Sequence, residues 1–435
     1  MGDMHKSGSF SALFLLVRRS LRQHALSTGI TVFSVALASG LVMAVFSVKT
    51  QTHEAFTGGS QGFDAILGAR GSQLQLVLNC VFHLETSPGN IPWKMYKEIK
   101  TNPFVELAIP YMVGDNYKGF RIVGTTEEIF TRLEYQEGKR YTFRSGEPFD
   151  PQSMDAVLGS YVAQKTGLKV NAIFKPYHGL FYDEATQHED EYRVVGVLNP
   201  TNTPADRAIW IPIDGLFRMS GHKLRGKGEA YEAKAGEEIP EEHKEVSAVM
   251  LKFRGEQAGM LFDQTINRQG DRATLAWPIA RVMAEFFEKI GLVDRVLALV
   301  AYLVCVVAAG SILASLYNTM NERRREFAIL RSLGARRSTI FSAILLESSA
   351  IAALGSLAGF AVYAAIVWVA AAIIKEKTGV VLDVFRSGTV EWGTHQVAVV
   401  ILAPLGMIGM GALAGIIPAY KAYATDVASN LAPLS

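Results

Sequence analysis

The sequence predicts an α-helical membrane protein with four transmembrane helices and a large α+β domain inserted between the first and second. The chain has 435 residues, of which 49% are hydrophobic and 19% are charged. Four uncharged stretches each reach the roughly 20 residues that a helix needs to cross ~30 Å of hydrocarbon. These stretches are residues 25–48, 296–320, 348–374 and 396–420. The helices that contain them are expected at residues 25–48, 292–320, 338–374 and 396–420.

Basic residues in the short segments predict which side of the membrane each segment faces. Short segments rich in lysine and arginine resist translocation, whereas long domains cross regardless of their charge. Residues 1–24, expected to form an amphipathic helix, and the loop at 321–337 are basic, whereas the link at 375–395 is balanced in charge. We therefore expect a multi-pass protein of the inner (cytoplasmic) membrane. Both termini, including the tail at 421–435, are expected in the cytoplasm.

Residues 49–291 are expected to form the extracytoplasmic (periplasmic) domain. Strand-like runs rich in Val, Ile and aromatic residues occur at 192–198, 208–213 and 247–253, and helical patterns occur at 92–100 and around 257–268. With roughly 240 residues the domain can bury a sizeable core. Residues 223–245 are densely charged and glycine-containing, so an exposed, mobile insertion is expected there, with a partner-binding arm as the alternative.

The end of this domain predicts a stalk. Residues 278–320 contain no proline or paired glycine after the first residue, so a helix begun outside can continue through the second membrane span. The alternative is a break near Gly291. The exposed stalk would carry charged residues, namely Arg281, Glu285, Glu288 and Lys289.

Several function classes have no support in the sequence. A net charge of only +2 does not favour nucleic-acid binding. Two cysteines, Cys80 and Cys305, exclude a disulfide scaffold and a CxxC metal site. No phosphate-binding GxxxxGK[ST] loop, GxSxG elbow or HExxH pair occurs. We therefore assign no catalytic residues and do not expect an enzyme.

The arginine-rich loop at 321–337 is the most informative motif. Phe327, Leu330 and Leu333 recur at helical spacing, and Gly334 can end that helix in left-handed geometry. From the residues alone, two readings stay open. This short amphipathic helix either docks on a soluble protein or anchors the membrane interface through its arginines.

The loop resembles the ExxREF/IAILRxLGA signature of permeases in the MacB-like superfamily, which includes macrolide exporters, lipoprotein-releasing permeases and FtsX-like permeases. The resemblance extends to other segments, namely Arg18-Arg19-Ser20-Leu21-Arg22, residues 64–82 with Gly68-Ala69-Arg70-Gly71-Ser72, residues 194–207, and Pro418-Ala419-Tyr420-Lys421-Ala422 followed by Asp426. In this family the loop after the second span is the coupling helix that binds an ATPase. The residues implied for coupling are Glu322, Arg323, Arg324, Arg325, Glu326, Phe327, Ile329, Leu330, Arg331, Leu333 and Gly334.

The resemblance also implies partners. An ABC ATPase dimer would bind ATP and magnesium, so no cofactor is expected in this chain. A second permease copy is expected, as a homodimer or alternatively a heterodimer, together with membrane lipids and a periplasmic or outer-membrane partner, but no nucleic acid. ATP-driven closure would move the external domains through the stalks and shift hydrophobic, lipidated or peptide-like cargo. The alternatives are an FtsX-like signalling permease that activates an external cell-wall enzyme and an exporter of a metal or metal complex.

Two polar features of the sequence are not explained by the resemblance to these permeases. Glu347 stands at the edge of the third span, where an acid is costly unless it is paired, so pairing with an arginine of another helix is favoured over proton coupling. His178, His188, Glu189 and Glu191 are ligand types for a divalent metal in one external loop. Such loops are usually only solvated, so no metal site is assigned and these four residues remain candidates.

Overall fold

The computed structural model describes residues 4–57, 62–180, 182–233, 237–378, 380–392 and 395–424. The chain divides into two compact units. The helical unit comprises Met1–Gln51, Gly291–Ala371 and Leu382–Ser435, and the large domain comprises Thr52–Ile290 and Ala372–Val381. Asp426 of the predicted tail lies outside the described residues.

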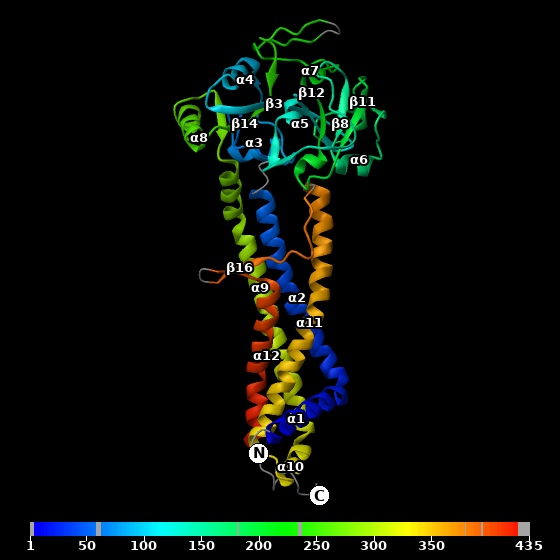
Figure 1. Cartoon of the computed structure of the whole chain (residues 1–435), viewed down its shortest axis with the longest axis vertical. Helices are drawn as coiled ribbons and strands as arrows, with labels where there is room; N and C mark the ends of the chain where they lie inside the picture. The colour runs from blue at the N-terminus through cyan, green and yellow to red at the C-terminus, as the bar shows by residue number, and fades with distance from the viewer. Residues whose placement is uncertain are drawn as a thin grey trace. The chain divides into compact units, whose positions relative to one another are not determined.

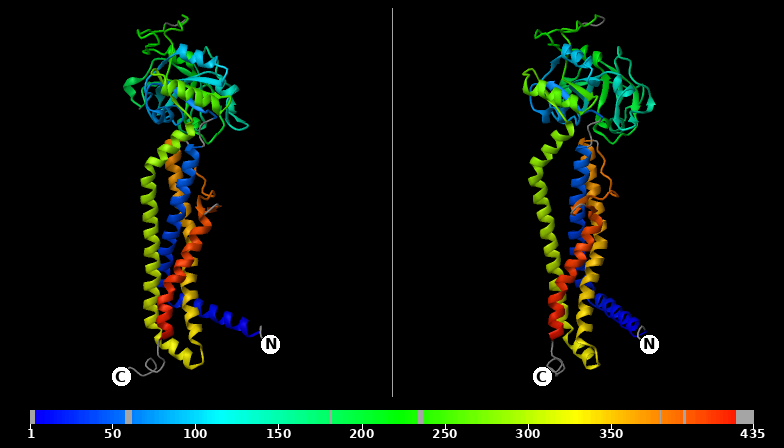
Figure 2. Two further views of the ribbon diagram at one scale, coloured as in Figure 1. Left: turned by 90° about the vertical axis from the view of Figure 1, so that its left-hand side faces the viewer. Right: turned by 60° about the vertical axis from the view of Figure 1, so that its left-hand side comes forward.

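The helical unit contains long apolar helices joined by short connections. Its elements are α1 (Met4–Gln23), α2 (Ala25–Thr57), α9 (Ile279–Glu322), α10 (Arg324–Ser332), α11 (Arg337–Thr378), β16 (Thr389–Trp392), β17 (His395–Ala398) and α12 (Val399–Ala424). One end of each of α2, α9 and α11 belongs to the large domain. Among the described residues, α2, α9, α11 and α12 are the four helices long and apolar enough to cross a membrane. This confirms the four predicted spans. Figures 1 and 2 show these helices running alongside one another, while α1 turns away from α2.

Small residues let these helices approach closely, as is common where helices pack inside membranes. A Cβ atom added to Gly40 of α2 would lie 2.6 Å from Cβ of Val362 on α11, and one added to Gly411 of α12 would lie 2.5 Å from Cβ of Ala352. The shared core takes buried side chains from all four helices, including Val35, Ile312, Ile351 and Met407. Larger residues at the glycine positions would force the helices apart.

Two helix boundaries bear on the predictions. The helix α9 runs for 44 residues without interruption, so the alternative of a break near Gly291 does not hold. The fourth helix begins at Val399, three residues after the predicted start. The expected start was early because His395–Ala398 pairs with Thr389–Trp392 as a β-hairpin, and these backbone groups are therefore not available to a helix.

The large domain is built on a mixed sheet, as predicted for an α+β domain. Its strands are β1 (Ala65–Ala69), β2 (Ile91–Pro92), β3 (Val105–Tyr117), β4 (Phe120–Thr125), β5 (Glu134–Gln136), β6 (Lys139–Arg140), β7 (Phe143–Gly146), β8 (Asp155–Leu158), β9 (Ile173–Phe174), β10 (Tyr177–His178), β11 (Tyr192–Leu198), β12 (Ile209–Pro212), β13 (Glu245–Val246), β14 (Ala248–Phe253) and β15 (Ala273–Ala276). Over the described residues, 11 of them form one sheet in the order β15-β1-β14-β3-β4-β12-β8-β11-β7, with β10 on β3 and β9 on β11. The predicted strands at 192–198, 208–213 and 247–253 are confirmed as β11, β12 and β14.

Helices cover both faces of this sheet, so neighbouring strand residues are buried on opposite sides. The helices are α3 (Gln73–Cys80), α4 (Trp93–Lys100), α5 (Glu128–Thr131), α6 (Ser160–Thr166), α7 (Ile213–Phe217) and α8 (Glu256–Asp263), with short turns η1 (Glu184–Thr186), η2 (Pro204–Arg207) and η3 (Gln264–Arg268). Buried residues of α3 and α5 share one core, whereas those of α6, α7 and α8 share the other. The first core also contains Ile279, Val282 and Met283. The start of α9 is therefore built into the large domain.

Most described residues of the charged segment at 223–245 are exposed, but apolar side chains anchor it to the domain. Leu224 and Ile239 are buried in the core, and the ring of Tyr231 stacks on His243 with 4.4 Å between centroids. Leu224 and Tyr231 also form a β-bridge. Leu224 and Ile239 thus anchor this segment at two points, while residues 234–236 lie outside the described residues.

Candidate functional site

The arginine-rich loop folds as the separate short helix α10. The helix ends at a glycine in left-handed geometry, Gly334, which has φ +98°. The N–H of Gly334 donates to the carbonyl of Arg331, and the N–H of Ala335 donates to the carbonyl of Leu330. This pair of bonds is the Schellman motif, which satisfies carbonyls that have no partner within the helix. The role expected of Gly334 at the helix end is confirmed.

The two sides of α10 differ in their burial. Phe327 is 5% exposed and packs with Met320, Ile340 and Ile344, and Leu330 lies partly buried against them. Leu333, by contrast, is 80% exposed and Ile329 is 43% exposed. Of the three apolar residues predicted at helical spacing, Phe327 and Leu330 pack inward, whereas Leu333, at the C-terminal cap, is exposed. The other exposed members of the predicted coupling set are Glu322, Arg324, Arg325, Glu326 and Gly334.

A buried polar network fixes the start of α10. Nη1 of Arg323 lies 3.3 Å from Oε2 of Glu347 on α11 and donates to Oγ of Ser20 on α1 at 2.6 Å. The Ser20 hydroxyl in turn donates to Oε1 of Glu347. The side chains of Arg323 and Glu347 are only 11% and 8% exposed. The favoured pairing of Glu347 with an arginine is thus confirmed.

The predicted stalk residues all lie on the exposed side of α9. Arg281 and Glu285 form an ion pair one helical turn apart, with Nε and Oε1 3.0 Å apart. Glu288 and Lys289 are exposed. The opposite side of this part of α9, with Ile279, Val282 and Met283, is buried in the core of the large domain.

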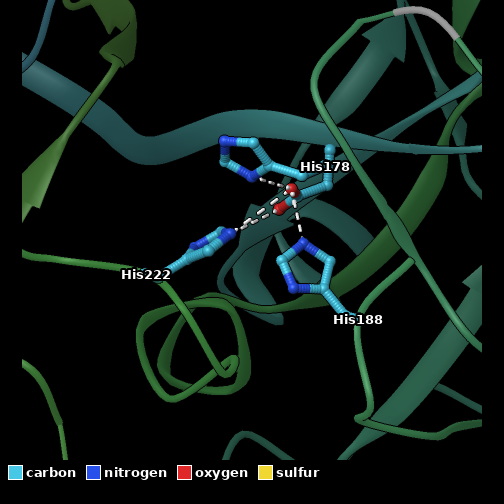
Figure 3. A group of neighbouring side chains, drawn as sticks. His178, His188 and His222 are labelled. Atoms are coloured by element: carbon cyan, nitrogen blue, oxygen red, sulfur yellow. Dashed lines mark hydrogen bonds and ion pairs between the residues drawn. The ribbon is translucent and has the colours of Figure 1, made fainter. Parts of the chain in front are cut away.

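A histidine cluster occupies the large domain around Asp115 (Figure 3). Nδ1 of His178 and Nε2 of His188 each lie 3.2 Å from Oδ1 of Asp115, and Nε2 of His222 lies 3.3 Å from both carboxylate oxygens. One ligand atom from each of the four residues lies within 4.8 Å of the other three. The histidine rings are 5.1–5.6 Å apart and steeply inclined to one another, at 71–80°.

Sheet pairing brings these residues together from distant parts of the chain. Strand β10 pairs with β3 so that His178 lies opposite Asp115. A bulge at Gly114 shifts the register of β3 with β4 just before Asp115, and such bulges re-aim the side chains next to them. His188 follows the bridge between Tyr177 and Gln187. His222 lies in the turn after α7, where its N–H donates to the carbonyl of Met219.

Burial and hydrogen bonding act in opposite directions on the Asp115 carboxyl. Burial would raise its pKa, but hydrogen bonds from the three histidines outweigh burial and hold the pKa well below its usual range. The hydrogen bond with Asp115 raises the pKa of His178. At His188, burial lowers the pKa, yet the contacts with Asp115 and the Ser220 carbonyl give a net rise. The cluster therefore favours negative charge on Asp115 and positive charge on His178 and His188.

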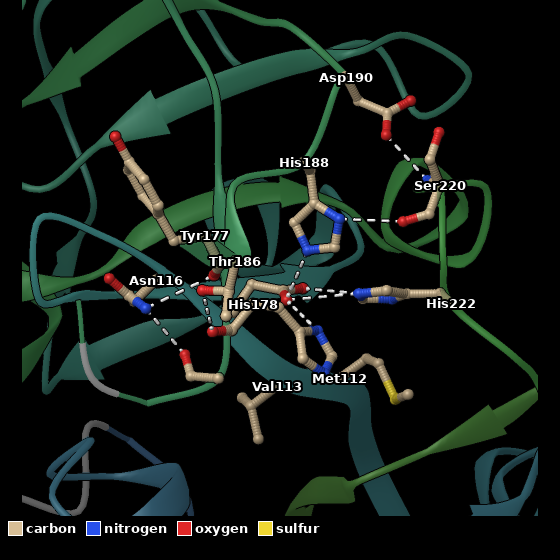
Figure 4. Close-up of polar contacts among 12 residues, drawn as sticks. Met112, Val113, Asn116, Tyr177, His178, Thr186, His188, Asp190, Ser220 and His222 are labelled. Atoms are coloured by element: carbon tan, nitrogen blue, oxygen red, sulfur yellow. Dashed lines mark hydrogen bonds and ion pairs between the residues drawn. The ribbon is translucent and has the colours of Figure 1, made fainter. Parts of the chain in front are cut away.

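Two of the predicted ligand candidates do not join this cluster. Glu189 is exposed, and Glu191 pairs with Lys175 at 3.6 Å. Their neighbour Asp190 instead accepts the N–H of Ser220 at 2.8 Å, and the carbonyl of the same Ser220 lies 2.9 Å from Nδ1 of His188 (Figure 4). Asp190 thereby holds the backbone of Ser220, whose carbonyl orients His188.

The sequence pattern pointed to neither Asp115 nor His222. The available signal for Asp115 was a lone acid in the apolar run at 107–117, which is unusual for a buried strand. For His222 there was no comparable signal, because it directly precedes the charged segment and looks like part of it.

Comparisons with known proteins cover both units. The model of the MacB-like periplasmic core domain matches residues 28–254, and that of the FtsX-like permease C-terminal region matches residues 298–427. The chain is similar to the periplasmic region of MacB from Actinobacillus actinomycetemcomitans, with 10% identity and a TM-score of 0.32 over 53% of this chain and 94% of that one. It is also similar to the extracellular domain of the noncanonic ABC-type transporter YknZ from Gram-positive bacteria, with 13% identity and a TM-score of 0.27 over 48% of this chain and 98% of that one. No curated protein matched.

Proposed function

The chain belongs to the MacB/FtsX-type family of ABC transporter permeases, in which the ATPase is a separate subunit, and on this premise we propose that it couples ATP hydrolysis by a partner ATPase to movement of its large domain. Two copies of the chain lie in the inner membrane and flank an ATPase dimer. Both termini and α10 face the cytoplasm, and the large domain faces the periplasm. The movement displaces hydrophobic, lipidated or peptide-like cargo on the periplasmic side.

The exposed side of α10 is the observation that carries this proposal. Arg325, Ile329 and Leu333 follow one another at four-residue spacing, which aligns them along one side of a helix. Two large apolar side chains at 43% and 80% exposure beside arginines suit a protein partner that has an apolar groove and acidic rim.

The inner side of α10 supports transmission of force. A docked ATPase pushes on a helix that is held at two places. The Arg323–Glu347–Ser20 network holds its start, and the buried side chain of Phe327 holds its inner side. Its neighbour α9 begins in the core of the large domain, at Ile279, and ends at Glu322 beside α10. Movement of the loop therefore has a continuous helix through which to act.

Copurification of the cognate ATPase tests the docking surface. Proline at Ile329 removes a backbone hydrogen bond within the short helix and costs about 3 kcal/mol, and Arg325→Glu reverses a charge on its exposed side. Both variants should lose the ATPase in detergent pull-downs while reaching the membrane at the wild-type level. Arg19→Glu, an exposed residue of α1, is the control with the same charge change and should retain the ATPase.

The same pull-downs can refute the proposal. If Ile329→Pro retains the ATPase and ATP hydrolysis still responds to the permease, α10 is not the docking element. If Arg19→Glu loses the ATPase as readily as Arg325→Glu does, the interaction depends on general basic charge rather than on this helix.

A further inference from the structure

The cluster of Asp115, His178, His188 and His222 has the composition and spacing of a metal site. We propose that these four side chains bind one divalent transition-metal ion, of which Zn²⁺ is the best match. The inference concerns the large domain alone and does not depend on how the chain docks its ATPase.

The distances fit a tetrahedral ion. Zinc binds histidine nitrogen and carboxylate oxygen at about 2.0–2.2 Å, so two ligands at the corners of a tetrahedron are about 3.3–3.5 Å apart. The three nitrogen–oxygen distances to Asp115 are 3.2–3.3 Å. The four ligand atoms all lie within 4.8 Å of one another, so small side-chain rotations bring the more distant pairs to this spacing.

The hydrogen bonds of His188 also favour a cation at the centre. Its Nδ1 lies 2.9 Å from the Ser220 carbonyl, which only accepts hydrogen bonds, so Nδ1 carries the proton. Metal binding uses the neutral ring, in which Nε2 carries the lone pair and lies on the side of Asp115. Such a second bond from a liganding histidine to a main-chain carbonyl is the usual support of a metal site.

The types of ligand select the class of ion. Three imidazole nitrogens and one carboxylate suit Zn²⁺ and its transition-metal neighbours, whereas Ca²⁺ and Mg²⁺ prefer oxygen ligands throughout. Four protein ligands also fill a tetrahedral ion and leave no open position for a reacting water. The arrangement therefore points to holding an ion rather than to hydrolysis.

The four side chains differ in exposure, and the exposed one gives an ion access from solvent. Asp115 is fully buried, and the side chains of His188 and His222 are 8% and 10% exposed. The side chain of His178 is 61% exposed and forms the outer edge of the cluster. An ion can therefore bind His178 first and reach the buried ligands after local rotation of the side chains.

Titration of the full-length chain with Zn²⁺ tests this proposal. The protein is purified in detergent without a polyhistidine tag, stripped with a chelator and titrated by calorimetry, with a zinc-binding dye as competitor. We expect one ion per chain. The buried thiols of Cys80 and Cys305 do not provide a competing exposed site. Co²⁺ in place of Zn²⁺ should give the strong visible absorption of a four-coordinate site, and millimolar Mg²⁺ or Ca²⁺ should not displace it.

Variants separate the cluster from adventitious binding. His178→Ala removes the most exposed ligand and should weaken binding at least tenfold with an unchanged circular dichroism spectrum. The double variant His188→Ala/His222→Ala should abolish binding. Glu189→Gln/Glu191→Gln is the matched control, because it removes two acids of the same loop that lie outside the cluster, and its affinity should equal that of the wild type.

Three results would overturn the proposal. The wild-type chain could fail to bind submillimolar Zn²⁺. The double histidine variant could bind as tightly as the wild type while remaining folded. Binding could instead depend on Glu189 and Glu191 and not on His178. Each result would leave the four residues as a hydrogen-bonded network without an ion, whatever the outcome of the ATPase pull-downs.

Discussion

Asp115 on β3 lies directly opposite His178 on β10 in antiparallel register, and Nδ1 of the histidine is 3.2 Å from Oδ1 of the aspartate. This strand pairing supplies the first contact of the cluster. His188 and His222 then approach the same carboxylate from two other segments. The cluster thus depends on main-chain pairing, and residues that support the backbone are expected to tune it.

Asp190→Asn tests this support. The carboxylate of Asp190 accepts the N–H of Ser220, whose carbonyl orients His188. Loss of such an outer partner typically weakens metal affinity by about 10–100-fold, so we expect a weakening in that range by Zn²⁺ titration. Glu189→Gln, which changes the exposed neighbouring acid, serves as the control and should have no effect. Equal affinities for Asp190→Asn and wild type would show that Asp190 does not position the site.

Glu347→Gln tests the buried network of the helical unit. Removing one charge of a buried ion pair leaves the other uncompensated, at a cost of about 3–5 kcal/mol. We expect a lower thermal midpoint in detergent and faster tryptic cleavage of the loop at 321–337. Glu326→Gln is the matched control, since Glu326 also contacts Arg323 but its side chain is 49% exposed, and an exposed pair contributes less than about 1 kcal/mol. Equal effects of both variants would contradict a special role for Glu347.

A flexible insertion tests whether α9 transmits movement. Gly-Gly-Ser-Gly placed after Gly291 interrupts the continuous helix, because each glycine costs about 1 kcal/mol relative to alanine. Spin labels at Lys139→Cys in two permease copies should report an ATP-dependent change in distance for the uninterrupted chain but not for the insertion variant. Basal ATP hydrolysis should persist in both, since α10 is unchanged.

The control for this experiment carries the same insertion after Gly228, an exposed turn residue with φ +96°. It should retain the ATP-dependent distance change. A distance change that survives the insertion at Gly291 would show that α9 is not the lever.

We predict that His83 makes the free energy of unfolding of the large domain fall at acidic pH. Burial, with Arg121 and Arg207 nearby, lowers the pKa of His83 to about 3 from its ordinary value of 6.5. Below about pH 6.5 the unfolded chain binds a proton that the folded chain does not, so this residue lowers stability as pH falls toward about 3, by up to about 1.4 kcal/mol per pH unit.

The variant His83→Asn checks this prediction and keeps a residue type that tolerates the positive φ of 57° at this position. Urea unfolding of the full chain, followed by tryptophan fluorescence between pH 7 and about pH 4, should show a shallower loss of stability than in the wild type. Val81→Ala in the same core should lower stability by a similar amount at every pH. Parallel curves for His83→Asn and wild type would contradict burial of a neutral histidine.

The sequence by itself determined the membrane helices, the position of the large domain and the end of α10. Each of these depends on residues close together in the chain. Uninterrupted apolar length defines a span, and a glycine such as Gly334 supplies the left-handed geometry that ends a helix. Strands β11, β12 and β14 were likewise predictable, because runs of Val, Ile and aromatic residues are a local signal.

Only the tertiary structure decided the histidine cluster and the two sides of α10. Asp115 and His222 are separated by 107 residues, and their meeting depends on the order of strands in the sheet and on the register of β10 against β3. Leu333 has the same helical spacing as Phe327 and Leu330, yet only contacts with other helices bury the latter two. Periodicity shows which residues share a face, whereas packing partners from distant segments determine whether that face is covered.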